Sequence, residues 1–294
     1  MNLKKQHMKK NNIAFTLFLA AVMVFTSCQP DEHELSPVLD KSEIQYEITQ
    51  DLVTDPGGNT VIMKNSTPGT ITYWDYGSGH STNATETIHF AFKGEYVIKL
   101  SVLTAGGMVN LDPKTITVTE NNLEYVNDPL WTALSGGVGN EKTWILDINA
   151  TKFDGPMYFY GTNNGWLEGG DKGCYGKDCW NWSPVYKDNT WLMPGGDYGT
   201  MTFSLKDKAG VVVNHLMIPS RGTETGSYFL DATAKKLTLT GATPIHDAGR
   251  DACVDAWGSI TLFSLTETTM QLGVLRKTSC DGAAMLVYNY VVKP

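Results

Sequence analysis

The chain has 294 residues, of which 41% are hydrophobic and 18% charged, and its formal net charge is −8. This composition excludes a disordered chain, a collagen and a coiled coil, and 29 Gly with 12 Pro indicate a turn-rich fold. At about 100–200 residues per domain we expect two domains. An acidic chain whose only arginines are Arg221, Arg250 and Arg276 is a poor match to nucleic acid, which clustered cations bind.

Residues 1–27 have the organisation of a signal peptide. A basic stretch from Lys4 to Lys10 precedes an apolar run from Ile13 to Phe25. As a helix this run spans only about 20 Å, which is shorter than the hydrocarbon core of a bilayer. Residues 1–27 hold four of the 23 basic residues and none of the 31 acidic ones, so the mature net charge is 19 − 31 = −12.

The end of this segment, Phe25-Thr26-Ser27-Cys28, resembles a bacterial lipoprotein signal. The resemblance implies that Cys28 is lipidated and that residues 28–41 are a tether. The acidic stretch Gln29 to Glu34 resembles the surface-export signal of Bacteroidetes lipoproteins. We therefore expect a lipid-anchored protein on the outer membrane, exposed at the cell surface. A plain secretory signal and an ordinary acidic linker are the alternatives.

Four cysteines remain after Cys28, and they are Cys174, Cys179, Cys253 and Cys280. An even number in an oxidising compartment predicts two disulfides, for which three pairings are possible. A local bond between Cys174 and Cys179 would leave Cys253 with Cys280. A zinc site is the alternative, but C-x-x-C spacing and nearby histidines are missing.

Residues 42–120 consist of short alternating segments separated by turns. The expected strands are 44–48, 60–63, 70–74, 87–92, 95–102 and 115–118. Turn residues such as Pro56-Gly57-Gly58 and Ala105-Gly106-Gly107 separate them. This spacing predicts an immunoglobulin-like sandwich.

Two blocks in this region resemble a PKD domain. They are Trp74-Asp75-Tyr76-Gly77 and the run from Ile88 to Val102, which contains His89-Phe90 and Gly94-Glu95-Tyr96-Val97. The resemblance implies a spacer that holds a working domain away from the cell. It also implies that Trp74 is a core residue.

After a linker at residues 121–130, residues 131–294 form a second β-like domain. Eight to ten short strands and no convincing amphipathic helix predict a jelly-roll sandwich. The predicted fold class is therefore all-β, with an immunoglobulin-like sandwich followed by a larger jelly-roll-type sandwich.

Catalytic and metal-binding motifs are missing from the sequence. It has no G-x-S-x-G, no P-loop and no H-E-x-x-H, and its histidines are far apart in sequence. A glycoside hydrolase needs two carboxylates a few ångströms apart, but no E-x-D-x-E pattern places them on one strand. Asp247, Asp251 and Asp255 could begin a structural Ca²⁺ site, although they lack a known calcium-loop spacing, and no other cofactor is expected.

An aromatic and polar stretch at residues 158–198 is the most distinctive feature of the second domain. It holds four of the eight tryptophans, interleaved with Gly, Asn and Asp. Flat aromatic rings and side-chain oxygens together suit a sugar. The predicted stacking residues are Trp166, Trp180, Trp182 and Trp191, and the predicted hydroxyl partners are Asn163, Asn164, Glu168 and Asp171. The alternative is that these tryptophans pack as a small core.

The second domain resembles a domain of Bacteroidetes surface lipoproteins of polysaccharide-utilisation systems. The resemblance lies in Lys142 to Asp147, Trp180 to Pro184 and Gly199 to Leu205. It implies a non-catalytic protein that binds polysaccharide and passes it to a TonB-dependent porter. The alternatives are a glycoside hydrolase on a jelly-roll fold and a surface adhesin or assembly protein.

Overall fold

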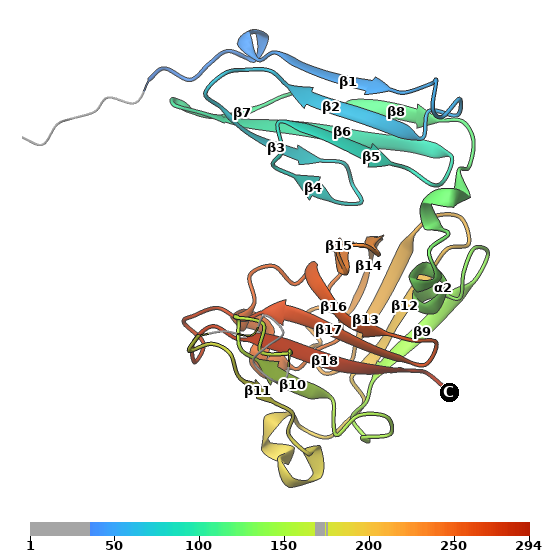
Figure 1. Cartoon of the computed structure of the whole chain (residues 1–294), viewed down its shortest axis with the longest axis vertical. Helices are drawn as coiled ribbons and strands as arrows, with labels where there is room; N and C mark the ends of the chain where they lie inside the picture. The colour runs from blue at the N-terminus through green and yellow to red at the C-terminus, as the bar shows by residue number, and fades with distance from the viewer. Residues whose placement is uncertain (1–35, 168–173, 175) are drawn as a thin grey trace, which may run out of the picture. The chain divides into compact units, whose positions relative to one another are not determined.

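The computed structural model describes residues 36–167, 174 and 176–294 (Figure 1). The chain divides into the units Met1–Pro37 and Val38–Pro294, and the described helices and strands lie in the second. Cys28, Glu168 and Asp171 lie outside the described residues. The described part is nearly all β, which confirms the predicted class. No helix within it has the length and apolarity needed to cross a bilayer.

The first eight strands form two sheets. One sheet has the order β1-β2-β5, and the other has the order β4-β3-β6-β7 with β8 also paired to β6. A 3-10 helix, η1 (Lys41–Glu43), precedes them. The strands are β1 (Tyr46–Gln50), β2 (Thr60–Asn65), β3 (Ile71–Asp75), β4 (His80–Ser81), β5 (Thr85–His89), β6 (Gly94–Thr104), β7 (Gly107–Asn110) and β8 (Lys114–Val118).

Alternating apolar side chains of both sheets fill the core between them. Along β6, Ile98, Leu100 and Val102 are buried while Val97 is exposed, as the two-residue period of a strand requires. Trp74 is fully buried, and its indole N–H donates to the carbonyl of Asn83 at 3.0 Å. It is therefore a core residue, as expected.

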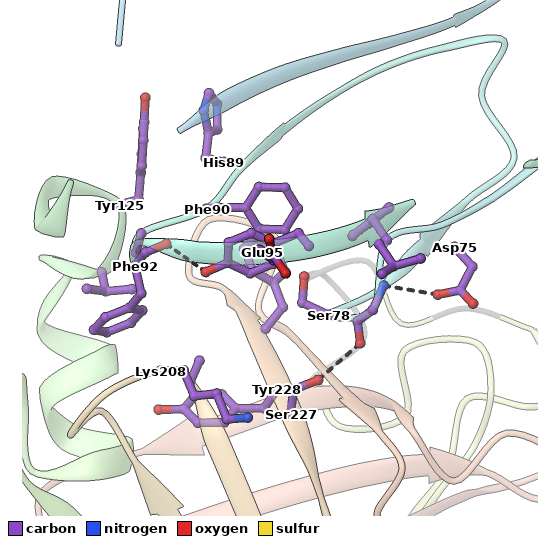
Figure 2. Close-up of a pocket in the computed structure, with 18 of the residues that line it drawn as sticks. Asp75, Ser78, His89, Phe90, Phe92, Glu95, Tyr125, Lys208, Ser227 and Tyr228 are labelled. Carbon is purple, nitrogen blue, oxygen red and sulfur yellow. Dashed lines mark hydrogen bonds between the residues drawn. The ribbon is translucent and has the colours of Figure 1, made fainter. Parts of the chain in front are cut away.

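The segment after β8 packs against the two sheets formed by β1 to β8, which we call the small sandwich. It forms η2 (Leu123–Val126), which Asn122 caps by accepting from the N–H of Glu124. The ring of Tyr125 stacks on His89 at 4.3 Å (Figure 2). Its hydroxyl donates to the buried carboxylate of Asp55. Although burial alone would raise it, hydrogen bonds from Thr60, Tyr125 and Asn122 hold the pKa of Asp55 below its usual value.

A short helix, α2 (Pro129–Ser135), opens the second half of the chain. Asp128 caps it by accepting from the N–H of Leu130 at 2.8 Å, and Pro129 occupies its first turn. Gly136 ends it in the left-handed region at φ 85°. These local signals produce a helix that runs from the end of the predicted linker into the second domain, where the sequence pattern predicts only strands.

The remaining strands form one sheet of ten. Its order is β11-β10-β18-β17-β16-β15-β14-β13-β12-β9, and β9 also pairs with β18 (Figure 1). The elements are β9 (Glu141–Leu146), β10 (Met157–Tyr160), β11 (Asn181–Trp182), η3 (Tyr186–Asp188), η4 (Thr190–Leu192), β12 (Gly199–Ser204), β13 (Gly210–His215), β14 (Thr223–Asp231), β15 (Lys236–Thr240), η5 (Ala248–Cys253), β16 (Ser259–Leu265), β17 (Thr269–Leu275) and β18 (Met285–Val292).

The strand order shows how this sheet closes. From β12 to β18 each strand pairs with the next one in sequence, and β9 joins the two ends of the series. A jelly roll would need strands that cross between two sheets, so the connectivity is a closed meander rather than the expected jelly roll. Hairpin connections between successive strands favour this order, because they keep neighbours in sequence side by side.

Large side chains fill the core of the closed sheet. Trp144 is fully buried, and its indole N–H donates to the carbonyl of Leu134 in α2 at 2.8 Å. Tyr228, Tyr288 and Tyr290 are at most 1% exposed. The hydroxyl of Tyr290 donates to the carbonyl of Ile245 at 2.6 Å, which satisfies a polar group that would otherwise be costly to bury.

Strand β18 changes its partner along its length. Met285 to Tyr288 pair with β10, whereas Tyr290 to Val292 pair with β9. Between them the amide of Asn289, which is fully buried, donates to the carbonyl of Gly155 at 2.7 Å. β9 and β10 therefore share one edge of β18 as two parts of an interrupted strand, separated by a loop at residues 147–156.

Asp147 organises this loop from its first residue. It is 1% exposed and accepts from the backbone N–H groups of Thr151, Lys152 and Phe153 at 2.7, 2.9 and 2.8 Å. The hydroxyl of Thr151 also donates to it at 2.7 Å. The single carboxylate thus sets the point at which β10 begins.

We expect Asp147→Ala to lower the free energy of unfolding by about 3 kcal/mol, because it removes a buried carboxylate that accepts hydrogen bonds from three backbone N–H groups and one hydroxyl. Chemical denaturation of the full mature chain measures the change. Asp207→Ala, at an exposed position in the turn between β12 and β13, is the control and should change stability by less than about 0.5 kcal/mol. Equal effects of the two substitutions would contradict the role assigned to Asp147.

Candidate functional site

The short strand β11 carries aromatic surface outward from the core. Trp182 pairs with Phe159 across β10 and β11, and their rings stack at 5.2 Å and 24°. Phe159 is 5% exposed, whereas Trp182 is 40% exposed. The pairing of the two strands therefore stacks the Trp182 ring on a buried ring while 40% of the residue stays exposed.

Trp191 extends this aromatic surface. It lies on η4, and its ring stacks with that of Trp182 at 6.1 Å and 27°. Trp191 is 72% exposed, the most of any tryptophan among the described residues. The rings of Phe159, Trp182 and Trp191 thus form a stacked series from the core to the surface, with successive rings inclined by 24° and 27°. We call Trp182 and Trp191 the tryptophan pair.

The other two predicted stacking residues lie differently. Trp180 is 38% exposed and lies two residues before Trp182. Trp166 meets the ring of Phe263 on β16 at 5.1 Å and 63°, an edge-to-face contact. The structure therefore brings together two of the four tryptophans as neighbours, and it places Trp166 in a different aromatic contact.

Tight backbone contacts hold the loop that contains Asn163 and Asn164 against the residues before β11. The N–H of Asn163 donates to the carbonyl of Asp178 at 3.3 Å, and both asparagines are half-buried. The amide of Asn181 donates to the carbonyl of Gly165 at 3.1 Å. The predicted partners Glu168 and Asp171 lie outside the described residues, so the structure shows nothing of their relation to these asparagines.

Two glycines make these contacts possible. A Cβ on Gly161 would lie 1.6 Å from the carbonyl oxygen of Asp178, and one on Gly165 would lie 2.0 Å from that of Trp180. Both distances are far below any allowed contact. The loop and the residues before β11 can approach this closely only because both positions are glycine.

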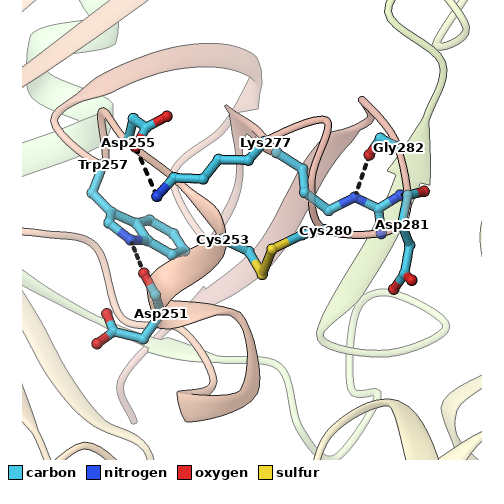
Figure 3. The surroundings of a disulfide bond; sticks show 9 residues. Asp251, Cys253, Asp255, Trp257, Lys277, Cys280, Asp281 and Gly282 are labelled. Atoms are coloured by element: carbon cyan, nitrogen blue, oxygen red, sulfur yellow. Dashed lines mark hydrogen bonds and ion pairs between the residues drawn. A yellow bond between two sulfur atoms is a disulfide. The ribbon is translucent and has the colours of Figure 1, made fainter.

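Both predicted disulfides are present. Cys174 bonds to Cys179 in the segment that leads to β11, and Cys253 bonds to Cys280. The second bond joins the end of η5 to the connection between β17 and β18 (Figure 3). Its cysteines are 27 residues apart, so it joins segments that are distant in sequence.

The three aspartates considered for calcium have separate partners. Asp247 accepts from Arg250 and from the hydroxyl of Tyr288, and Asp255 pairs with Lys277 at 2.7 Å (Figure 3). Asp251 pairs with Arg221 at 2.7 Å. Within the described residues no three His, Cys, Asp or Glu side chains gather in a way that could hold a metal ion.

Two histidines that are far apart in sequence meet in the structure. The rings of His215 and His246 lie 5.6 Å apart, and both side chains are buried. His215 contacts Glu224 at 3.2 Å and His246 contacts Asp251 at 2.9 Å, while Arg221 bridges the two carboxylates. We call these five residues the histidine cluster. Sequence spacing gave no signal for it, because it depends on how β13, β14 and the loop before η5 pack.

Burial dominates the electrostatics of the two histidines. It lowers the pKa of His246 below 6.5, although the carbonyl of Pro244 and the carboxylate of Asp251 favour the charged ring. It also lowers the pKa of His215, against the attraction of Glu224. Among the described residues the Nδ1 atom of His215 has no hydrogen-bond partner, which also suits a neutral ring.

The two carboxylates of the histidine cluster shift in the same direction. Although burial would raise it, hydrogen bonds from Thr243 and Arg221 hold the pKa of Glu224 below its usual 4.5. Hydrogen bonds from His246 and Arg221 likewise outweigh burial and hold the pKa of Asp251 below its usual 3.8. Both carboxylates are therefore ionised at neutral pH and paired with the same arginine.

We expect acidification to destabilise the protein in two stages. An unfolded histidine binds its proton near pH 6.5, so below this value the unfolded chain binds more protons than the folded one and the melting temperature falls. The melting temperature falls further below about pH 4.5, because the carboxylates of the unfolded chain then bind protons while those of the folded chain, with lowered pKa values, do not. This loss continues until the pH reaches the lowered pKa values of Glu224 and Asp251. Thermal melts across this range measure both stages.

His215→Gln should make the first stage shallower, because it removes a titrating ring while keeping an N–H donor. His80→Gln, at an exposed position in the small sandwich, is the control and should keep the slope of the parent protein. An unchanged slope in His215→Gln would assign the acid sensitivity to groups outside the histidine cluster.

Gly165→Ala should destabilise the protein by about 1–3 kcal/mol, because the new Cβ collides with the carbonyl of Trp180. We also expect a changed near-ultraviolet circular dichroism spectrum, since the collision displaces the residues that lead to Trp182. Gly195→Ala is the matched control, because nothing lies within 4 Å of a Cβ at that position. If both variants keep the stability and spectrum of the parent, the loop does not depend on this close approach.

No protein-family model and no curated protein matches the chain. The solved structures that match include one described as the structural basis for the promiscuous specificity of carbohydrate-binding modules from the β-sandwich superfamily. It is 15% identical, the match covers 85% of this chain and 90% of that chain, and the TM-score is 0.19. A likeness at this level does not assign a ligand to this chain.

Proposed function

We propose that the protein binds polysaccharide at the tryptophan pair without cleaving it. The observation that carries this proposal is the stacking of Trp182 and Trp191 outside the core, with 40% and 72% of the side chains exposed. A ring of this size in water is costly unless it serves a contact. The buried ring of Phe159 behind Trp182 keeps the surface rigid.

The chemistry of the tryptophan pair matches that of a sugar ring. The C–H face of a sugar packs on a flat aromatic ring, and its hydroxyls need donors and acceptors around that ring. Exposed polar side chains lie on the same segment as the rings, at Asn181, Ser183, Lys187 and Asp188. This combination favours a glycan over a purely apolar ligand.

The cellular setting of this site is a second part of the proposal. Lipidation at Cys28 would anchor the chain to the outer membrane, and the PKD-like residues 42–120 would act as a spacer. The bound polysaccharide would then be presented at the cell surface to a TonB-dependent porter. The lipoprotein-like residues Phe25 to Cys28 and the acidic stretch that follows them support this setting.

Affinity electrophoresis of the full mature chain in gels that contain a panel of polysaccharides tests the binding. We expect Trp191→Ala and Trp182→Ala each to reduce retardation by at least about tenfold in apparent affinity, which corresponds to about 1.4 kcal/mol. Trp191→Ala should also leave the melting temperature nearly unchanged, since most of its ring is exposed. The control is Tyr73→Ala, which removes an aromatic ring that is 43% exposed on β3.

Product analysis in the same gels distinguishes the alternatives. New reducing ends would show a glycoside hydrolase and would contradict the absence of cleavage. A parent protein that no polysaccharide of a broad panel retards would contradict glycan binding and favour an adhesin or assembly protein. Equal retardation of the parent and Trp191→Ala would show that the polysaccharide binds elsewhere than at the tryptophan pair.

A further inference from the structure

We propose that Arg250 is a positioning residue that holds the two halves of the tryptophan pair together. This inference rests on the proposed function, since it assigns a residue to the same site. Arg250 lies on η5, between β15 and β16, and is distant in sequence from both tryptophans. Nothing in the motifs or the spacing of the sequence points to it.

One guanidinium contacts both structural supports of the pair. Its carbon lies 5.4 Å from the centre of the Phe159 ring, in a cation–π arrangement. Its Nη1 donates to the carbonyl of Leu192 at 2.9 Å. Phe159 is the ring on which Trp182 stacks, and Leu192 is the residue directly after Trp191. Arg250 therefore connects β10, behind Trp182, with η4, which carries Trp191.

The arginine is itself held in place by a buried carboxylate. Nη1 also donates to Asp247 at 2.8 Å, and the side chain of Asp247 is only 3% exposed. The other oxygen of Asp247 accepts from the hydroxyl of Tyr288 at 3.0 Å, on β18. The guanidinium is thus held in place by a buried residue that is itself bonded to the closed sheet.

The far end of η5 is fixed as well. Cys253, its last residue, is bonded to Cys280, and the indole N–H of Trp257 donates to the carbonyl of Asp251 at 3.0 Å (Figure 3). Asp247 therefore ties the start of the helix to β18, and Cys253 ties its end to the connection between β17 and β18, with Arg250 between them. A support of this kind lowers the ordering cost when a ligand binds.

Only an arginine meets these demands together. The Nη1 atom carries two hydrogens, which point to the Leu192 carbonyl and the Asp247 carboxylate, while the planar group lies over the Phe159 ring. Lysine has the charge but not the planar group. We therefore expect Arg250→Lys to retain a fold close to that of the parent and to lose the fixed geometry of the pair.

A spectroscopic test addresses the positioning without any ligand. Two stacked indoles give an exciton couplet in far-ultraviolet circular dichroism, and Trp191→Phe in the full mature chain identifies the part that comes from the pair. We expect Arg250→Lys and Arg250→Met to reduce this couplet as Trp191→Phe does. We also expect iodide to quench the tryptophan fluorescence of the two Arg250 variants more strongly than that of the parent.

The matched control is Arg276→Lys. Arg276 donates to the carbonyls of Gly282 and Asp281 at 2.9 and 2.8 Å, next to Cys280, and the cation–π contacts among the described residues do not include it. This variant should lose a comparable pair of hydrogen bonds and keep the couplet. In affinity electrophoresis Arg250→Lys should bind about tenfold more weakly than the parent, and Arg276→Lys should bind as the parent does.

The outcomes separate this inference from the proposed function. A parent that binds no glycan would refute the function, and the couplet would still test the positioning. If the Arg250 variants keep the couplet, or if Arg276→Lys loses it equally, the positioning role is wrong. A couplet lost in Arg250→Lys with parental affinity for a bound glycan would also overturn the inference, because the geometry of the pair would then not matter for binding.

Discussion

The larger domain depends on one edge of β18, which pairs with two different strands. Its first half binds β10 and its second half binds β9, with Asn289 bridging the gap between them. The pairing with β9 closes the sheet and buries its core. The pairing with β10 leaves that strand free on its other side, where β11 adds Trp182 and η4 then brings Trp191 beside it. Core formation and site formation therefore depend on the same strand.

Local chemistry made much of the fold predictable. Alternation in β6 marks the core of the small sandwich, and the even set of four cysteines predicts two disulfides, both of which are present. Asp128 followed by Pro129 is also a local helix-start signal, and α2 begins there. These features depend on neighbours in sequence, which is the information that a single chain displays.

Features that depend on distant contacts were not predictable. The strands of a closed meander and those of a jelly roll show the same alternation of apolar and polar residues, so the sequence pattern does not distinguish the two folds. The four tryptophans lie in one stretch of sequence, but Trp166 turns to Phe263 while Trp182 and Trp191 stack together. The contacts of Arg250 form only when the connection between β15 and β16 packs against the rest of the domain. The same is true of the histidine cluster. Contacts between residues that are distant in sequence produce no periodic pattern in the sequence.

The position of the tryptophan pair also has an evolutionary consequence. Both rings lie in the excursion between β10 and β12, outside the hydrogen-bond ladders that close the sheet. Under the proposed function, insertions, deletions and ring replacements in this excursion can therefore alter glycan preference without breaking the ladder from β12 to β18. Among related chains we expect the excursion to diverge fastest, with Gly161 and Gly165 retained because they let it return close to the sheet. A scaffold with this separation can acquire a new specificity while keeping its stability.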